Sequence, residues 1–326
     1  MQEAWTTRRA SLRDRDALVD LCLAAVGPDD YVLEFLDDLV LRGVVFVALD
    51  HDRIVGATAY HELLDGTAWL NAARTHPDVQ RRGVARALVA ALENLARLKG
   101  LKALRLWTEA TNEAGIATFQ AAGFLEVARI ARFVADASGT RAVAPKALNL
   151  SEDLWASIEA SAVLKASNGY AHAGEGFVRV DRPTLHALVN RRLLLGWNGN
   201  GAVLDPYDGP RESVLGVHPV FGDVREILRA APALARAQGH ASVETFLPLS
   251  RPFLEIARSL GYTYGTWARE AILCEKPLSV STVVLRKRKT MAEINASKRS
   301  GYAALALLAP AHDHGQAGPH EDRWNP

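Results

Sequence analysis

The spacing of apolar positions along the first 135 residues changes several times, and each change predicts a new element. After Ser11, apolar residues recur at helical intervals and stop before Gly27, which predicts a helix over 11–26. The same pattern predicts a second helix over 31–41. Branched and aromatic residues then form three runs that predict consecutive antiparallel strands, over 44–49, 54–64 and 67–75.

The pattern becomes helical again after Gly83 and stays so until Gly100. A strand over 103–107, a helix over 113–122 and a strand over 124–134 are predicted next. The order is therefore two helices, three strands, a helix, a strand, a helix and a strand. This order predicts an α/β fold of the α+β type, with a mixed and mostly antiparallel sheet flanked by helices.

The second half of the chain repeats landmarks of the first half. Three pairs of residues recur at nearly constant separation: His76 and His218, Gly100 and Gly239, and Gly123 and Gly261. The two members of each pair occupy the same place in a strand, helix, strand, helix order. Such recurrence predicts a duplicated supersecondary unit.

The length of the chain favours two domains, because 326 residues exceed the size at which a single core usually stops growing. The segment 136–150 is rich in small residues and lacks periodicity, so we expect a linker there. The predicted domains are therefore 1–135 and 151–278. The residues 279–326 have no core pattern, and we expect a disordered tail in which the basic run 286–289 is solvated.

Composition and charge narrow the range of partners. The formal net charge is +1, which provides no overall field to attract nucleic acid or an anionic membrane surface. No apolar run approaches the ~20 residues of a membrane-spanning helix, and no secretory signal is recognisable. Cys22 and Cys274 show no paired spacing, which favours a reducing compartment. We therefore expect a cytoplasmic protein with no nucleic acid, no membrane and no metal among its partners.

One segment carries a clear chemical signal, at the point where the third strand meets the following helix. It consists of Gln80, Arg81, Arg82, Gly83, Val84, Ala85 and Arg86. The small residues at 83 and 85 leave the backbone accessible, and the first amides of a helix bind anions at the positive end of its dipole. The three arginines can reach phosphate oxygens. The segment therefore predicts a pyrophosphate site.

The second half lacks this loop. The chain is a few residues shorter between His218 and the next predicted helix, and Asp223 stands at the start of that helix. A carboxylate at this point would repel a phosphate. We therefore expect a single phosphate site, in the first half.

The loop resembles the Gln/Arg-x-x-Gly-x-Gly/Ala motif of the GNAT superfamily, read here as Gln80, Gly83 and Ala85. A second family motif, an Asn ahead of a helix that ends in Gly-Phe, is similar to Asn112 and the segment that closes at Gly123. The resemblance covers about 4–134. It implies an acetyl-CoA-dependent acyltransferase with a GNAT fold, followed by a degenerate GNAT-like domain without the phosphate loop. The run 271–278 also looks like the closing strand of such a domain.

The same resemblance implies the remaining cofactor contacts. The strand before the loop would part from the next parallel strand, and the pantetheine arm would pair with the exposed edge. The amide of Ala73 would then face the thioester oxygen, and that of Thr75 the pantetheine. Asn112 and Phe119 would lie beside the cofactor. Many relatives carry a Tyr at the position of Phe119 to protonate the departing thiolate, and this chain cannot use a side chain there for that purpose.

The resemblance implies direct attack of a free amine on the thioester, which requires a base or a water chain. Glu109 is the first candidate for the base, and His76 and Glu62 follow. The acceptor is expected to be the primary amine of a small molecule or amino acid. A protein acceptor and a non-catalytic acyl-CoA sensor are the alternatives, and the oligomeric state is left open. Four aromatic residues of the second half could line the acceptor site: Trp197, Tyr207, Phe246 and Trp267.

Overall fold

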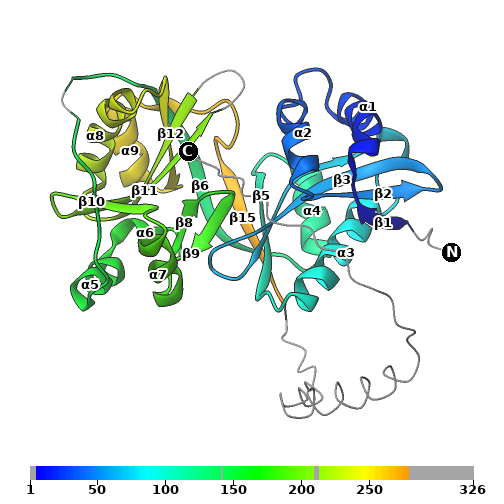
Figure 1. Cartoon of the computed structure of the whole chain (residues 1–326), viewed down its shortest axis with the longest axis horizontal. Helices are drawn as coiled ribbons and strands as arrows, with labels where there is room; N and C mark the ends of the chain where they lie inside the picture. Colours follow the sequence, from blue (N-terminus) through cyan, green and yellow to red (C-terminus); the bar gives the residue numbers. More distant parts are fainter. Residues whose placement is uncertain (1–4, 141, 209–212, 279–326) are drawn as a thin grey trace, which may run out of the picture. The chain divides into compact units, whose positions relative to one another are not determined.

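The structure, a computed structural model, describes residues 5–140, 142–208 and 213–278. These residues form a 13-stranded sheet and a 2-stranded sheet, with helices packed against them (Figure 1). The predicted tail at 279–326 and its basic run lie outside the described residues. Within the described ranges, every helix is too short or too polar to cross a membrane.

The first half follows the predicted order, with a short extra strand at its start. Its helices are η1 (Leu12–Asp14), α1 (Arg15–Ala25), α2 (Val32–Leu41), η2 (Pro77–Val79), α3 (Val84–Leu98) and α4 (Glu113–Ala121). Its strands are β1 (Thr6–Arg9), β2 (Val45–Asp50), β3 (Arg53–Glu62), β4 (Ala68–Thr75), β5 (Ala103–Glu109) and β6 (Leu125–Asp136). The α/β fold and the mostly antiparallel sheet predicted from the sequence are confirmed.

The second half contains a comparable set of elements. Its helices are α5 (Glu152–Ala160), α6 (Ala162–Ala166), α7 (Arg182–Asn190), α8 (Val224–Ala237) and α9 (Arg251–Ser259). Its strands are β7 (Lys146–Ala147), β8 (Tyr170–Ala173), β9 (Gly176–Arg179), β10 (Leu194–Trp197), β11 (Asn200–Asp208), β12 (Ser213–Phe221), β13 (Ser242–Pro248), β14 (Thr263–Tyr264) and β15 (Ala271–Pro277).

The two halves share the large sheet, whose main path runs β1-β2-β3-β4-β5-β15-β6-β13-β12-β11-β10-β7. The last strand of the second half, β15, lies between β5 and β6 of the first half and pairs antiparallel with both (Figure 1, orange). The strand β6 in turn pairs with β13. Each half therefore contributes a strand to its neighbour's region of the sheet, whereas the sequence pattern assigned 271–278 to the second copy.

Two layers of helices cover the first half of the sheet. Leu88 and Val84 of α3 pack against Val55 of β3, on one face of the sheet. Leu21 of α1 and Leu36 of α2 pack with residues of β2 and β3 on the opposite face. Because side chains alternate along a strand, neighbouring residues of β3 to β5 belong to different layers. The sheet of the first half therefore has helices on both of its faces.

The second half buries its own core beneath α8 and α9, where Leu215 and Val243 of the sheet meet Ile227 of α8. The short strand β7 lies within the segment 136–150, which was expected to be a linker, and it pairs with β10. The sequence pattern missed it because two residues carry no periodicity. The sequence pattern also missed β1, whose four residues pair with β2 although most of their side chains are exposed.

A buried charged network joins the two halves. The guanidinium of Arg105 on β5 lies 2.7 Å from Asp65 and 2.7 Å from Glu275 of β15. It also donates to the carbonyl of Phe177 at 2.7 Å, and its carbon lies 4.9 Å from the ring centroid of Tyr170. Because the arginine side chain is only 2% exposed, its charge is balanced almost wholly by these contacts.

Candidate functional site

The loop between β4 and α3 has the backbone geometry of an anion site. Gly83 adopts φ +89° at the N-cap of α3, a conformation that residues with a side chain rarely take. The N–H of Ala87 donates to the carbonyl of Gly83, at 3.0 Å, and closes the first turn of the helix. The amides that precede Ala87 lie in the first turn, where an α-helix offers no intrahelical acceptor. They and the helix dipole can therefore receive an anion.

The side chains of the loop add positive charge. Arg81 and Arg86 are exposed, and neither forms an ion pair with any residue in the part of the chain that the structure describes. Arg82 is held differently, since its carbonyl accepts a bond of 3.1 Å from the indole of Trp5 and its guanidinium lies over that ring. Gln80 is exposed beside them. Two arginines are thus available to bind phosphate oxygens.

Hydrophobic packing fixes the position of this loop. Val84 is 2% exposed and packs against Gly56 of β3, where a methyl group on the glycine would lie 2.4 Å from the valine. Ala85, one residue further, is half-buried. The start of α3 is therefore seated on the sheet, and its amides point from a rigid element.

The strand before the loop parts from its parallel neighbour. The strands β4 and β5 pair only at Ala68 with Leu104 and at Trp69 with Arg105, near their amino ends. Beyond that point no residue of either strand is paired with the other, so the two strands open toward their carboxyl ends. This register agrees with the expectation that the strand before the loop parts from its parallel neighbour.

A β-bulge in β4 lies at the same level. The partners of Asn71 and Arg74 on β3 are Ala59 and Ala57, which leaves Ala72 and Ala73 without a partner of their own. Ala72 has φ +54°, and such bulges redirect the backbone. Ala73 is exposed. Thr75, at the end of the strand, returns to the ladder opposite Gly56.

The three candidate bases lie in different places. Continuing the register from Trp69 and Arg105 brings Glu109 to the level of Ala73, across the opening. His76 follows β4, and its Nε2 lies 2.8 Å from Nη2 of Arg53. Glu62 stands opposite Ala68, at the closed end of the strands, where Lys99 forms an ion pair with it. The structure thus brings Glu109 and His76 to the open end and leaves Glu62 at the other end.

Glu109 has a structural contact of its own. Its Oε1 accepts a hydrogen bond of 2.5 Å from the backbone N–H of Ala268. The side chain is half-buried, at the carboxyl end of β5. Its second oxygen has no hydrogen-bond or ion-pair partner among the described residues.

Asn112 and Phe119 take structural positions near the cleft. Asn112 caps α4, since its Oδ1 accepts from the N–H of Gly115 at 3.0 Å and its Nδ2 donates to Thr108 at 3.0 Å. Phe119 packs edge to face on Phe124, with ring centroids 5.9 Å apart. The asparagine therefore ties the helix to β5, and the phenylalanine is only partly buried.

The corresponding opening in the second half is filled by the protein itself. The strands β12 and β13 also pair only near their amino ends, up to Gly216 with Glu244. Further along, the side chain of His218 accepts a bond of 3.3 Å from the backbone N–H of Phe246. Asp223 caps α8 by accepting from the N–H of Arg225 at 2.8 Å. A side chain thus replaces an external strand here, and a carboxylate occupies the helix start.

One group of residues in the described ranges has the composition of a metal site, formed by His172, Asp205 and His218. Because the N–H of Phe246 donates to Nδ1 of His218, that ring carries its hydrogen on Nε2, the atom that would have to bind the ion. Burial lowers the pKa of His218 well below its usual value. His218 is therefore a neutral, buried histidine whose Nδ1 already accepts a backbone hydrogen bond.

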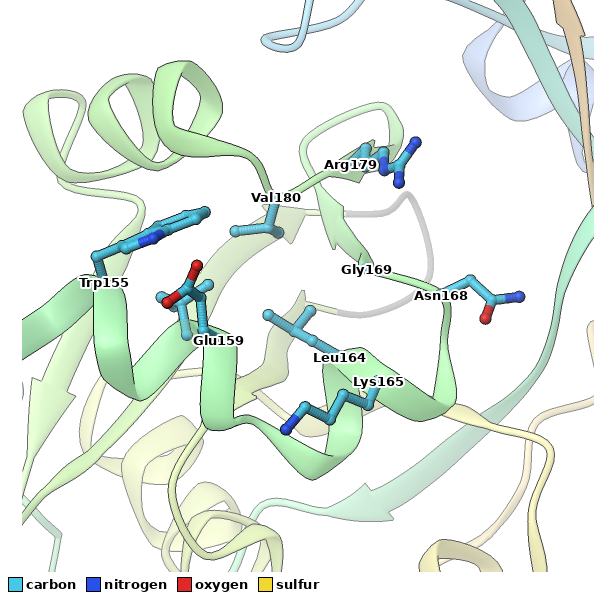
Figure 2. A pocket seen from close by; sticks show the side chains of 9 residues that line it. Trp155, Glu159, Leu164, Lys165, Asn168, Gly169, Arg179 and Val180 are labelled. Carbon is cyan, nitrogen blue, oxygen red and sulfur yellow. The ribbon is translucent and has the colours of Figure 1, made fainter.

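A groove of about 560 Å³ lies on the second half, between α5, α6 and the end of β9. Figure 2 shows Trp155 and Val180 along it, with Lys165 and Arg179 at its margins. All of its lining residues fall between 155 and 180. It therefore shares no residue with the loop and cleft of the first half.

Sequence reasoning missed a contact that shapes the cleft from the second half. Trp267 stacks on Trp107 of β5, with ring centroids 5.8 Å apart and planes at 16°. Of the four aromatic residues suggested for the acceptor side, Trp197 and Phe246 are buried in cores, whereas Tyr207 and Trp267 are exposed. The stacking joins residues 160 positions apart, and only the placement of β15 could have revealed it.

Comparisons with known proteins agree with this geometry. Residues 15–124 match the model of the Acetyltransferase (GNAT) family. A GCN5-related N-acetyltransferase from Sphaerobacter thermophilus has a similar structure, with a TM-score of 0.53, 14% identity, and coverage of 85% of this chain and 96% of that chain. A protein from Thermoplasma acidophilum named as an acetyltransferase has a TM-score of 0.52 and 16% identity, and the match covers 84% of this chain and 94% of that one. No curated protein matches the chain.

Proposed function

Residues 15–124 form an acetyltransferase domain of the GNAT family, and from that premise we propose that the chain transfers an acetyl group from acetyl-CoA to the primary amine of a small molecule. The observation that carries the proposal is the opening between β4 and β5 directly beside the anion-binding loop. A diphosphate at the loop and an extended arm in the opening would satisfy both features at once.

The proposed cofactor site follows from these two features. The amides at the start of α3 would bind the diphosphate, with Arg81 and Arg86 adding charge. The pantetheine would lie along β4, past Thr75, toward the bulge. The N–H of Ala73 would then donate to the thioester oxygen. This contact strengthens as negative charge develops on that oxygen, so it would lower the barrier to attack.

The reaction itself needs little from the side chains. The amine nitrogen attacks the thioester carbonyl carbon, the carbon–sulfur bond breaks, and the thiolate of coenzyme A departs. Holding both reactants in the opening supplies much of the rate. A proton leaves the nitrogen, and Glu109 is our candidate to accept it, directly or through water. With Phe119 at the position of the usual tyrosine, we propose that water protonates the thiolate.

The loop can be tested by replacing its glycine. The Gly83→Glu variant places a carboxylate on the proposed diphosphate site and strains a residue at φ +89°. We expect binding of acetyl-CoA, followed by calorimetric titration, to weaken by at least about a hundredfold, because several charge-assisted bonds are lost at once. Thiol release with a panel of amines should fall in parallel.

A matched control uses the opposite end of the same helix. Gly100 also has a positive φ, of +72°, and a side chain added there would meet no atom within 4 Å. The Gly100→Glu variant should therefore bind acetyl-CoA as the unmodified chain does. Wild-type affinity in Gly83→Glu, or an equal loss in both variants, would contradict the proposed site.

A non-catalytic acyl-CoA sensor is the second candidate, and Phe119 is the observation in its favour. A side chain without a hydroxyl removes one means of protonating the leaving group. Tight binding of acetyl-CoA with no thiol release on any amine would support the sensor over the enzyme.

A further inference from the structure

Two aromatic residues of the second half are exposed, Trp267 on the segment before β15 and Tyr207 on β11. Trp267 is 42% exposed and Tyr207 is 37% exposed, although both make close contacts within the protein. The guanidinium carbon of Arg132 lies 4.0 Å from the ring centroid of Trp267, and Phe246 packs 6.2 Å from the same ring. Large aromatic side chains that are rigidly held and still accessible are typical of binding surfaces.

The segment that carries the tryptophan, residues 265–270, is fixed to the first half and is called here the Trp267 loop. The N–H of Ala268 donates to Glu109, and its carbonyl accepts from the N–H of Arg132 at 2.8 Å. The N–H of Ala110 donates to the carbonyl of Glu270, also at 2.8 Å. The loop is therefore hydrogen-bonded to the carboxyl end of β5, one of the two strands that border the opening.

The loop lies on the side of the sheet opposite α3. On β5, Leu104 and Leu106 pack into the cluster beneath α3, whereas Trp107 belongs to a cluster on the other face. The helix α3 begins at the proposed diphosphate site, so the cofactor's anionic end approaches from that helix. A second substrate has to reach the opening from elsewhere, and Trp107 lies on the other face of β5.

The buried charged groups beside this surface form a pair. The Nε of Arg132 donates to Glu244 at 2.7 Å, and both side chains are less than a tenth exposed. The hydroxyl of Tyr207 donates to the same carboxylate at 3.3 Å, and burial raises the pKa of the phenol to about 12, so it stays protonated. A buried pair of this kind leaves little charge to attract an ionic ligand. Trp267 and Tyr207 supply the accessible aromatic area, and the charged side chains of Arg269 and Glu270 are exposed on the same loop as Trp267.

We propose that the Trp267 loop and Tyr207 form a platform for the acceptor, and that the acceptor is a primary amine attached to a flat, uncharged aromatic ring. This inference rests on the proposed function. The ring would lie against Trp267 while a short linker carries the amine toward Ala73 and Glu109. Stacking on aromatic side chains provides affinity without requiring a charge on the body of the acceptor.

The experiment compares three amines as acceptors for the full-length protein with acetyl-CoA, with thiol release as the readout. Tryptamine carries a flat ring, hexylamine is an apolar amine without one, and spermidine is a polycation. We expect kcat/KM for tryptamine to exceed that for hexylamine by about three- to tenfold, the value of one good aromatic contact. In the Trp267→Ala variant this ratio should fall close to one, and in Trp267→Phe it should largely return.

The matched control is Trp155→Ala, a partly exposed tryptophan of the second half that lines the groove in Figure 2, far in sequence from the loop. It should leave the ratio unchanged. Equal or better turnover of hexylamine or spermidine would overturn the platform, as would a preference for tryptamine that survives Trp267→Ala. Acetyl-CoA binding is measured in each variant. Its absence from the unmodified protein would overturn the proposed function itself.

Discussion

At the scale of single residues, Glu109 is placed to serve two roles, one through each oxygen of its carboxylate. One oxygen anchors the Trp267 loop, and the other is available to accept a proton. Its Oε1 holds the Trp267 loop through the N–H of Ala268, and its position at the end of β5 brings it level with Ala73. A carboxylate and a carboxamide both accept a hydrogen bond through an oxygen, but only the carboxylate can take up a proton from the attacking amine. The two roles can therefore be separated by substitution.

We expect Glu109→Gln to lower kcat for the best amine by about 10²- to 10⁴-fold, the usual contribution of a positioned base, with little change in the affinity for acetyl-CoA. The loop contact is retained, because the glutamine oxygen can still accept from Ala268. Glu109→Ala should additionally raise KM for the acceptor, since the loop loses its anchor. A kcat for Glu109→Gln equal to that of the unmodified chain, across a series of pH values, would exclude the residue as the base.

The backbone geometry of the loop between β4 and α3 could be predicted from sequence because it is local. Seven consecutive positions, with a glycine where φ is positive, define the helix start and its charge. The proposed acceptor side could not be predicted in this way. Its contact between Trp107 and Trp267 joins residues that meet only after the sheet has formed. Likewise, nothing local showed that Lys99 neutralises Glu62.

At the scale of elements, β15 decides how the two halves depend on each other. Its residues Leu273 and Cys274 are less than a tenth exposed, and they pair with Trp107 and Leu106 of β5 on one side. The other side of the strand pairs with β6. Without β15, the facing edges of β5 and β6 would each expose unpaired backbone groups, and such groups are costly when buried. The sheet of the first half is therefore incomplete without β15.

Two truncations test this dependence. A chain that ends at residue 270 lacks β15, and we expect it to lose cooperative thermal unfolding and acetyl-CoA binding together. A chain that ends at residue 278 keeps every described element and should retain both properties. Calorimetry and circular dichroism provide the measurements. A folded 1–270 chain that binds acetyl-CoA normally would show that β15 is dispensable for the first half.

The pattern of 271–278 predicted a strand correctly, but it could not reveal the neighbours of that strand. The continuous apolar run 271–274 indicates that both faces of the strand are buried, and it carries no information on which strands pair with its edges. Consecutive elements are usually adjacent in space, so the expectation assigned the strand to its own half. Exchange of strands between the halves overrides that tendency, because each exchanged strand completes the hydrogen-bond ladder of its host.

At the scale of the whole described molecule, the network around Arg105 connects three regions that are remote in sequence. It joins the turn after β3 through Asp65, the exchanged strand through Glu275, and the β8–β9 hairpin through Phe177. Asp65 also accepts the N–H of Arg179 at 2.9 Å. A buried network in which every charge is paired makes the relative position of its members specific, even where its net contribution to stability is modest.

Removing the arginine alone should therefore be far more damaging than removing a surface ion pair. Arg105→Leu would leave the carboxylates of Asp65 and Glu275 buried without their cation, and we expect the free energy of unfolding to fall by about 3–5 kcal/mol. Arg182→Ala, which breaks the exposed pair with Glu152, should leave the free energy of unfolding close to that of the unmodified chain, because solvent screens such a pair. Chemical denaturation of the full chain measures both.

Since Arg105 lies on β5, two residues before Trp107, the loss of its side chain should also loosen the Trp267 platform. The KM for the acceptor should therefore rise before acetyl-CoA binding weakens. Equal stability of the two variants would mean that hydrophobic contacts alone hold the halves together.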